Sequence, residues 1–342
     1  MTEIPEPQHS IVNLIDEHHA SQVDRPRLHM GASILGHHCD RYLWLNFRWA
    51  VIEQFPGRIK RLFRRGHHEE SWIVSDLKAI GIKIHSTEGD QSRIDLGCHI
   101  GGSLDGIINS GVPGALKTKH VAEFKTHALK SFTGLSNKGV EASKPMHWIQ
   151  MQLYMLGTGI ERALYVAICK NDDNIYTERV KFDREAAEKA LARGKRIVKG
   201  DRIPPPCSTD PSWYQCSYCA AKSFCHQTNR TEQVNCRTCA NSTANDDGTW
   251  TCSRWDDAVI PDETQYDGCD SHILHPDLVP WKLVPTDADH EATYEIMGHH
   301  VRNGEADGFV FSSKEILANP EACATKDNLV MKIRSELGGR IQ

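Results

Sequence analysis

The stretch from about residue 204 to 280 constrains the fold of this chain most, because it is rich in cysteine and tryptophan and poor in apolar runs. A segment of this composition gains little stability from a hydrophobic core, and bound metal is the usual substitute in small modules. The whole chain has 12 cysteines among 342 residues. In a reducing compartment, thiols at this density are better explained by metal ligation than by disulfide bonds. The sequence therefore predicts a metal-bound module after the triple proline at 204–206.

The composition of the whole chain is that of a soluble globular protein, with 39% hydrophobic and 25% charged residues. No apolar run approaches the roughly 20 residues that a membrane span needs. The polar start from Met1 to Pro5 does not resemble a signal peptide. We therefore expect a cytoplasmic protein with no membrane partner.

One basic patch contrasts with the overall net charge of −5. Arg61, Arg64 and Arg65 crowd into the run that precedes Gly66, together with other basic residues. A local patch can follow a nucleic-acid backbone even on an acidic protein, although a charge run is as often a solvated face. We predict DNA contacts for these three arginines.

Before the triple proline, the apolar pattern is that of an α/β domain. Apolar residues recur at helical spacing in 66–80, whereas 82–127 is strand-like, with glycine-bearing turns between short apolar segments. Helix and strand signals then alternate, which is typical of a mixed sheet flanked by helices. The expected elements are helices at 33–47, 66–80, 145–157 and 183–199, and strands within 82–127 and near 163–169 and 176–182.

Two carboxylates and a lysine are prominent in the strand-like region. Asp105 lies in the stretch GGSLDG, and Glu123 and Lys125 lie in the stretch VAEFKT. Side chains two apart on a strand leave the same face, so Glu123 and Lys125 are expected side by side. Carboxylates are preferred ligands of hard divalent cations, and a neighbouring lysine can hold water and offset charge on a phosphate. The pattern indicates a metal-dependent phosphodiesterase, whereas an isolated E-x-K is more often a solvated strand.

Four cysteines in the later part of the cysteine-rich stretch are spaced like the ligands of one metal ion. Cys236 and Cys239 are separated by two residues, and Cys252 and Cys269 follow. Paired and spaced thiols of this kind usually form a closed tetrahedral zinc site, which can fold a segment with little core. His272 is an alternative to Cys269 as the fourth ligand. We predict a zinc ion in this set.

Asp105, the E-x-K stretch and a Gln150–Tyr154 pair together resemble the PD-(D/E)XK superfamily, in particular its RecB-like branch. That branch includes CRISPR-associated nucleases, AddB-type helicase-nucleases and many bacteriophage exonucleases. The match covers roughly residues 31–230. Leu104 stands where the superfamily's name places a proline, a departure that is common among its members.

The resemblance implies a restriction-endonuclease-like core, an α/β fold with a central mixed sheet flanked by helices. It implies that Mg²⁺ or Mn²⁺ binds at the acidic pair, that the lysine positions the attacking water, and that the glutamine and tyrosine orient the site and touch DNA. A helix-borne histidine is a further ligand, and His67 is preferred over His68, with Glu70 one turn away. The implied catalytic residues are Asp105, Glu123, Lys125, Gln150 and Tyr154, and the implied ligands are His67, Asp105, Glu123 and the carbonyl of Phe124.

The resemblance also implies an iron–sulfur cluster. Cys216, Cys219 and Cys225 match the three-cysteine run of the iron–sulfur members, and Cys39 stands where their lone upstream cysteine is expected. We expect these four thiolates to hold a [4Fe–4S] cluster. Cys207 is a rival fourth ligand, and a four-cysteine zinc site is the alternative, since thiolates suit either metal.

We therefore predict a DNA nuclease, most simply an exonuclease of recombination, repair or phage replication. We expect it to act on single- or double-stranded DNA with a recombination or replication protein as partner, in the host cytoplasm if a phage encodes it. The rivals are a structure-selective endonuclease and a non-catalytic module that grips DNA or protein on an inactive nuclease fold. The predicted parts are an N-terminal arm at 1–30, a RecB-like nuclease domain with an iron–sulfur site at 31–230, a cysteine-rich zinc module at 231–280 and a C-terminal extension at 281–342.

Overall fold

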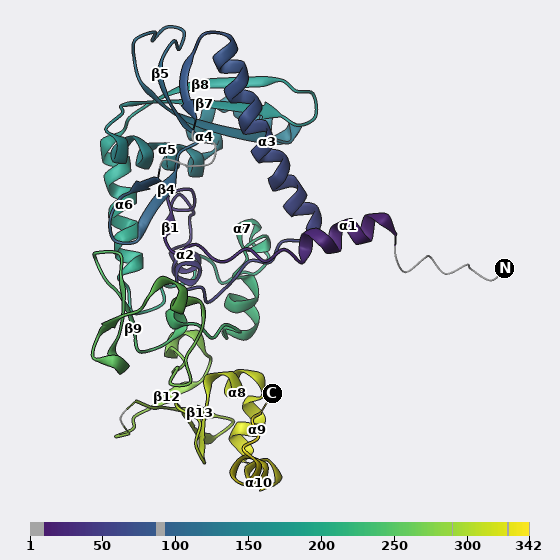
Figure 1. Cartoon of the computed structure of the whole chain (residues 1–342), viewed down its shortest axis with the longest axis vertical. Helices are drawn as coiled ribbons and strands as arrows, with labels where there is room; N and C mark the ends of the chain where they lie inside the picture. The colour runs from purple at the N-terminus through teal and green to yellow at the C-terminus, as the bar shows by residue number, and fades with distance from the viewer. Residues whose placement is uncertain (1–9, 87–92, 289, 327, 342) are drawn as a thin grey trace, which may run out of the picture.

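A five-stranded mixed sheet forms the centre of the larger, upper part of the molecule (Figure 1). Its strands are β2 (Lys83–Ser86), β5 (Gly106–Ser110), β6 (His120–His127), β7 (Arg162–Cys169) and β8 (Ile175–Lys181). They lie in the order β2-β5-β6-β7-β8, where β6 and β7 run parallel and the other neighbours antiparallel. The prediction of an α/β body around a central mixed sheet is confirmed. The computed structural model describes residues 10–86, 93–288, 290–326 and 328–341.

Helices cover both faces of this sheet. The helix α3 (Gly57–Ala79) packs its apolar side on the face that carries Phe124. The helices α4 (Leu129–Ser143) and α5 (Pro145–Thr158) pack on the opposite face. Because successive residues of a strand leave opposite faces, Glu123 of β6 is turned towards α5.

Two helices begin at positions that differ from the sequence prediction. The helix expected at 66–80 begins at Gly57, because a single glycine at position 66 does not interrupt a helix that packs along its length. The helix expected at 33–47 is shorter, since the residues before Asp40 form turns. The corresponding element is α2 (Asp40–Phe47).

The ends of α5 and α6 follow familiar helix chemistry. Pro145 occupies the first turn of α5, where the missing N–H costs nothing. Gly159 follows α5 with φ of 68°, a conformation that glycine adopts without strain. The helix α6 (Arg184–Val198) begins after Asp183, whose side chain accepts a hydrogen bond from the backbone N–H of Ala186.

A smaller sheet brings the N-terminal segment close to the central sheet. It has the order β1-β4-β3, with β1 at Met30–Gly31, β3 at Arg93–Asp95 and β4 at Ile100–Ser103. Asp105 lies in the bend between β4 and β5, rather than on a strand as the sequence suggested. Before β1, the helix α1 (Ile11–Ala20) lies against α3, as Figure 1 shows.

The cysteine-rich stretch forms short elements below the central sheet in Figure 1. The composition predicted that this stretch has little hydrophobic core. The structure differs, because Trp250, Ile260 and Leu278 join the main hydrophobic core of the body. Trp250 therefore packs the module onto its neighbour, whereas Trp255 is exposed. The elements are α7 (Tyr214–Ser217), η1 (Phe224–Thr228), η2 (Cys236–Thr238), β9 (Ser242–Ala244), β10 (Trp250–Cys252), η3 (Ser253–Trp255), β11 (Ala258–Val259), η4 (Asp262–Tyr266) and η5 (Pro276–Leu278).

The C-terminal residues form a small folded unit with its own core. A four-stranded sheet of order β12-β13-β14-β15 packs with short helices, and a buried ion pair joins Glu315 to Arg334. Across the described residues of the whole chain, no helix is both long and apolar enough to cross a membrane. The elements are β12 (Lys282–Val284), β13 (Ala292–Ile296), β14 (His299–Asn303), β15 (Val310–Phe311), α8 (Ser313–Ala318), α9 (Pro320–Thr325) and α10 (Asn328–Leu337).

Candidate active site

Glu123 and Lys125 lie side by side on the α5-facing side of β6. The Glu123 side chain has no exposed surface, whereas the Lys125 side chain is 27% exposed. Lys125 Nζ is in ion contact with Glu123 Oε1. Apart from this contact, Glu123 Oε1 accepts no hydrogen bond of normal geometry from the described residues.

Asp105 reaches the same lysine from the bend between β4 and β5. Its Oδ2 accepts a hydrogen bond of 2.7 Å from the backbone N–H of Phe124 and lies 3.9 Å from Lys125 Nζ. Lys125 Nζ also donates to the carbonyl of Phe124 at 3.0 Å. The structure thus brings the carboxyl groups of Asp105 and Glu123 together around the ammonium group of Lys125.

Gln150 and Tyr154 of α5 lie behind Glu123. Gln150 Nε2 donates to Glu123 Oε2 and to the Tyr154 hydroxyl, each at 3.1 Å. The tyrosine ring packs closely against Gly102, where a Cβ would come within 2.8 Å of the Tyr154 hydroxyl. In the structure these two side chains orient the buried carboxylate, and Gly102 leaves room for the ring.

Glu70 of α3 lies near enough to Asp105 for the charge of that carboxylate to act on it. Burial and the charge of Asp105 raise the pKa of Glu70. His67 is 76% exposed, and its Nδ1 lies 3.8 Å from Glu70 Oε2. His68, the alternative, is exposed as well. His67 as a metal ligand therefore stays a prediction, and Glu70 is a carboxylate that the sequence named only as its neighbour.

The electrostatics of this set disfavour the ionisation of all its carboxyl groups without a further cation. Burial raises the pKa of Glu123 to about 8; Lys125 opposes this shift and Asp105 adds to it. Burial alone would lower the pKa of Lys125, but Glu123 and Asp105 raise it, so the lysine is charged. With Glu70, three carboxyl groups face one ammonium group, a donor set that fits a hard divalent cation. Among the described residues, however, no three His, Cys, Asp or Glu side chains already stand in an arrangement that could hold a metal ion.

A cavity of about 630 Å³ opens beside these residues. Lys125 and Glu70 line it together with the aromatic ring of Phe63 and two basic side chains, Arg27 and Lys170, that the sequence analysis did not single out. Cationic and aromatic side chains of this kind suit a nucleic-acid strand, whose phosphates and bases they can contact.

Of the predicted DNA contacts, Arg61 forms an ion pair with Asp16 of α1. Arg65 Nε lies 3.4 Å from Glu69 Oε1 on its own helix. Arg64 is exposed. The three arginines therefore differ in how free they are to meet a phosphate.

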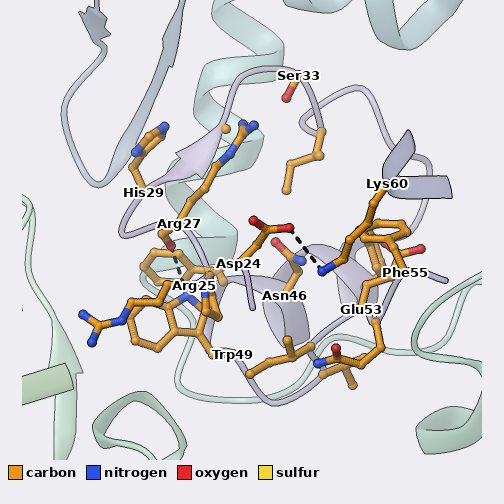
Figure 2. A pocket seen from close by; sticks show the side chains of 18 residues that line it. Asp24, Arg25, Arg27, His29, Ser33, Asn46, Trp49, Glu53, Phe55 and Lys60 are labelled. Carbon is orange, nitrogen blue, oxygen red and sulfur yellow. Dashed lines mark hydrogen bonds and ion pairs between the residues drawn. The ribbon is translucent and has the colours of Figure 1, made fainter. Parts of the chain in front are cut away.

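A second cavity, of about 310 Å³, adjoins the first, because Arg27 and Phe55 line both. Figure 2 shows it between the segment that precedes β1, the end of α2 and the start of α3. Trp49 forms one wall and donates its indole N–H to the carbonyl of Arg27 at 3.0 Å. Lys60 Nζ lies 3.7 Å from Asp24 Oδ2.

The first cysteine set gathers in the structure. Cys39 at the start of α2 lines one small cavity with Cys216, Cys219 and Cys225, and Cys207 lines it as well. Burial, and then hydrogen bonds with Cys39 and Cys216, raise the pKa of Cys207 to about 12. Cys39 and Cys207, the two candidates for the fourth ligand, therefore line the same cavity.

The thiols of the second cysteine set, Cys236, Cys239, Cys252 and Cys269, act on one another electrostatically. Burial raises the pKa of Cys236 to about 12, and Cys239, Cys269 and Cys252 add to that shift. Cys239 Sγ accepts hydrogen bonds from the backbone N–H groups of Asn241 and Ile273, at 3.5 and 3.4 Å. Burial raises the pKa of Cys239 to about 11, and these two donors oppose that shift.

His272, the alternative to Cys269, has both ring nitrogens in use. Its Nδ1 lies 2.7 Å from Ser313 Oγ, and its Nε2 lies 3.2 Å from Thr238 Oγ1. Cys269 is therefore the better candidate for the fourth ligand of the second set.

Comparison with known proteins adds little to this geometry. No protein-family model matches the chain, and no curated protein is similar to it. The solved structures that resemble it include SSO0001, with 19% identity, 64% of this chain and 97% of that chain covered, and a TM-score of 0.39. LHK-Exo in complex with dAMP has 16% identity, coverage of 50% and 86%, and a TM-score of 0.35. The alkaline exonuclease LHK-Exo from Laribacter hongkongensis has 16% identity, coverage of 54% and 90%, and a TM-score of 0.33. At these values, function must be argued from the site itself.

Proposed function

We propose that this protein is a Mg²⁺- or Mn²⁺-dependent deoxyribonuclease with a PD-(D/E)XK core of the RecB-like branch, and that it degrades DNA as an exonuclease. One observation carries the proposal: the Lys125 ammonium group lies between Glu123 and Asp105, and Gln150 orients the buried carboxylate. A lysine between two acidic residues at the mouth of a basic and aromatic cavity suits phosphodiester hydrolysis.

Each residue of the site has a distinct part in this proposal. Asp105, Glu123 and the carbonyl of Phe124 would hold the cation, with His67 or Glu70 as the helix-borne ligand. When bound, the cation would neutralise charge at the phosphate and lower the pKa of a water molecule. Lys125 holds the attacking water and stabilises the charge that develops on the phosphate.

We expect purified protein to degrade linear labelled DNA in Mg²⁺ or Mn²⁺, to leave a covalently closed circle intact, and to lose all cleavage in EDTA. An obligate exonuclease needs a free end, so the circle separates the two kinds of nuclease. The measurement is gel analysis of end-labelled linear strands, single and double, beside circular DNA.

Other outcomes of this experiment are equally informative. Intact linear DNA in both metals would contradict the nuclease function. DNA affinity that survives Glu123→Ala, without cleavage by the parent, would indicate a non-catalytic binding module. Cleavage of the closed circle would indicate an endonuclease.

We further propose a [4Fe–4S] cluster at Cys39, Cys216, Cys219 and Cys225 and a zinc ion at Cys236, Cys239, Cys252 and Cys269. After anaerobic purification we expect about four iron atoms and about one zinc atom per chain, with absorption near roughly 400 nm. Cys219→Ser should lose iron and keep zinc, whereas the control Cys323→Ser, a buried thiol outside both sets, should keep both. Zinc alone in both sites would contradict the cluster.

A further inference from the structure

A group of polar rings lies on the same side of the sheet as Lys125, in a part of the site that the proposed mechanism does not use. His127 follows Lys125 by two residues on β6, Tyr165 lies on the neighbouring strand β7, and His147 lies in the first turn of α5. The Tyr165 hydroxyl is 2.9 Å from His127 Nε2 and 2.9 Å from His147 Nδ1. The hydroxyl therefore links two imidazole rings, whose centroids are 5.8 Å apart.

This chain of hydrogen bonds extends through Ser131 to Lys144. Lys144 Nζ donates to Ser131 Oγ at 2.9 Å, and Ser131 Oγ lies 3.4 Å from His127 Nδ1. An ammonium group can only donate, so the serine hydroxyl accepts from it and has its own proton free for His127 Nδ1. When Ser131 donates to Nδ1, His127 carries its proton on Nε2 and donates to Tyr165, and we assign this tautomer.

The same reasoning sets the proton of His147. The Tyr165 hydroxyl accepts from His127 and donates its own proton to His147 Nδ1, so a neutral His147 carries its proton on Nε2. Burial, and then the positive charge of Lys125, lower the pKa of His147 to about 3. Burial, and then the charge of Lys144, lower the pKa of His127 to about 4. Both rings are therefore neutral near pH 7.

His147 lies on the same side of α5 as the residue that contacts Glu123. It precedes Gln150 by three residues on α5, so the two side chains share the helix face that meets Glu123. The first turn of a helix also carries free backbone N–H groups and favours negative charge. Among the described residues, none accepts a hydrogen bond from His147 Nε2, so this N–H is available to a ligand.

We propose that His147, in its Nε2–H form, donates a hydrogen bond to a backbone phosphate of the nucleic-acid substrate. Tyr165, His127, Ser131 and Lys144 are positioning residues that fix its tautomer and ring orientation. The inference rests on the proposed nuclease function and adds a substrate-binding residue outside the set that the sequence pointed to.

Two amide replacements distinguish this role from a structural one. Glutamine places its amide N–H near the position of histidine Nε2, whereas asparagine places its amide near Nδ1, next to Tyr165. We expect kcat/KM on a labelled oligonucleotide to fall about 10- to 100-fold in His147→Ala and His147→Asn, as for loss of a hydrogen bond to a charged group, and to recover substantially in His147→Gln. Recovery in His147→Asn but not in His147→Gln would overturn the proposal, and so would parent-like cleavage by all three variants.

A second measurement separates this inference from the nuclease function. Affinity for a labelled single-stranded oligonucleotide in Ca²⁺, without cleavage, should follow the same order of variants, even if the parent protein cleaves nothing. Thermal unfolding of each variant shows whether the fold is kept. Nitrogen-15 NMR of labelled histidine should show the Nε2–H form for both His127 and His147, and the Nδ1–H form of His147 would contradict the chain of donors.

Discussion

Lys125→Ala is expected to reduce DNA cleavage about 100- to 1,000-fold, the usual cost of removing one group that stabilises charge in a transition state. The ammonium group contacts Glu123 and lies 3.9 Å from Asp105, so its loss leaves the developing negative charge without its protein partner. It also leaves a fully buried carboxyl group without a cation, and Glu123 will then take up a proton more readily. The measurement is the single-turnover rate on end-labelled linear DNA in Mg²⁺.

Three comparisons make this result specific to the site. Lys125→Arg keeps the charge but not the compact ammonium group, so most of the loss should remain. Lys199→Ala removes an exposed lysine that pairs with Asp246, and its cleavage rate should equal that of the parent. Thermal unfolding of each variant excludes loss of the fold. If Lys125→Ala cleaves as fast as the parent, the catalytic role proposed for Lys125 is wrong, whether the protein is an exonuclease or an endonuclease.

The parts of this site that could be predicted from sequence depend on local geometry. Alternation along one strand is enough to place Glu123 and Lys125 on one face, and a spacing of four on a helix places Gln150 and Tyr154 together. The same alternation extends to His127, and the spacing on α5 extends back to His147. These two signals were present in the sequence, and the link between them, Tyr165, was not visible because it depends on the register of β6 with β7.

Other features depend on contacts between distant segments, which no local pattern encodes. The sequence could not show that the charge of Asp105 raises the pKa of Glu70, because their proximity depends on how α3 crosses the central sheet. The same holds for Trp250, which joins the main core although its neighbours in sequence are polar. The start of α3 was missed because Gly66 resembles a helix boundary, and tertiary packing outweighs its low helix propensity.

The junction between the body and the cysteine-rich part depends on one buried arginine, Arg237, which lies between the first two cysteines of the second set. Its guanidinium group donates to the carbonyls of Phe47 and Leu28 at 3.1 and 2.8 Å, and twice to Gln265 Oε1, at 3.0 and 2.7 Å. It also lies 3.8 Å from the ring centroid of Trp49. Among the described residues, no carboxylate forms an ion pair with it.

Arg237→Ala is therefore expected to lower the free energy of unfolding by about 3–5 kcal/mol. The substitution leaves the carbonyl groups of Phe47 and Leu28 without their donor and removes the cation–π contact with Trp49. Urea denaturation followed by fluorescence measures this loss. Arg237→Lys should recover little of it, because one ammonium group cannot reach acceptors on three separate segments. The control Arg184→Ala removes an arginine that is 65% exposed, and its effect should stay within about 0.5 kcal/mol. A small effect of Arg237→Ala would mean that the cysteine-rich part is held by other contacts, of which the packing of Trp250 is the next to test.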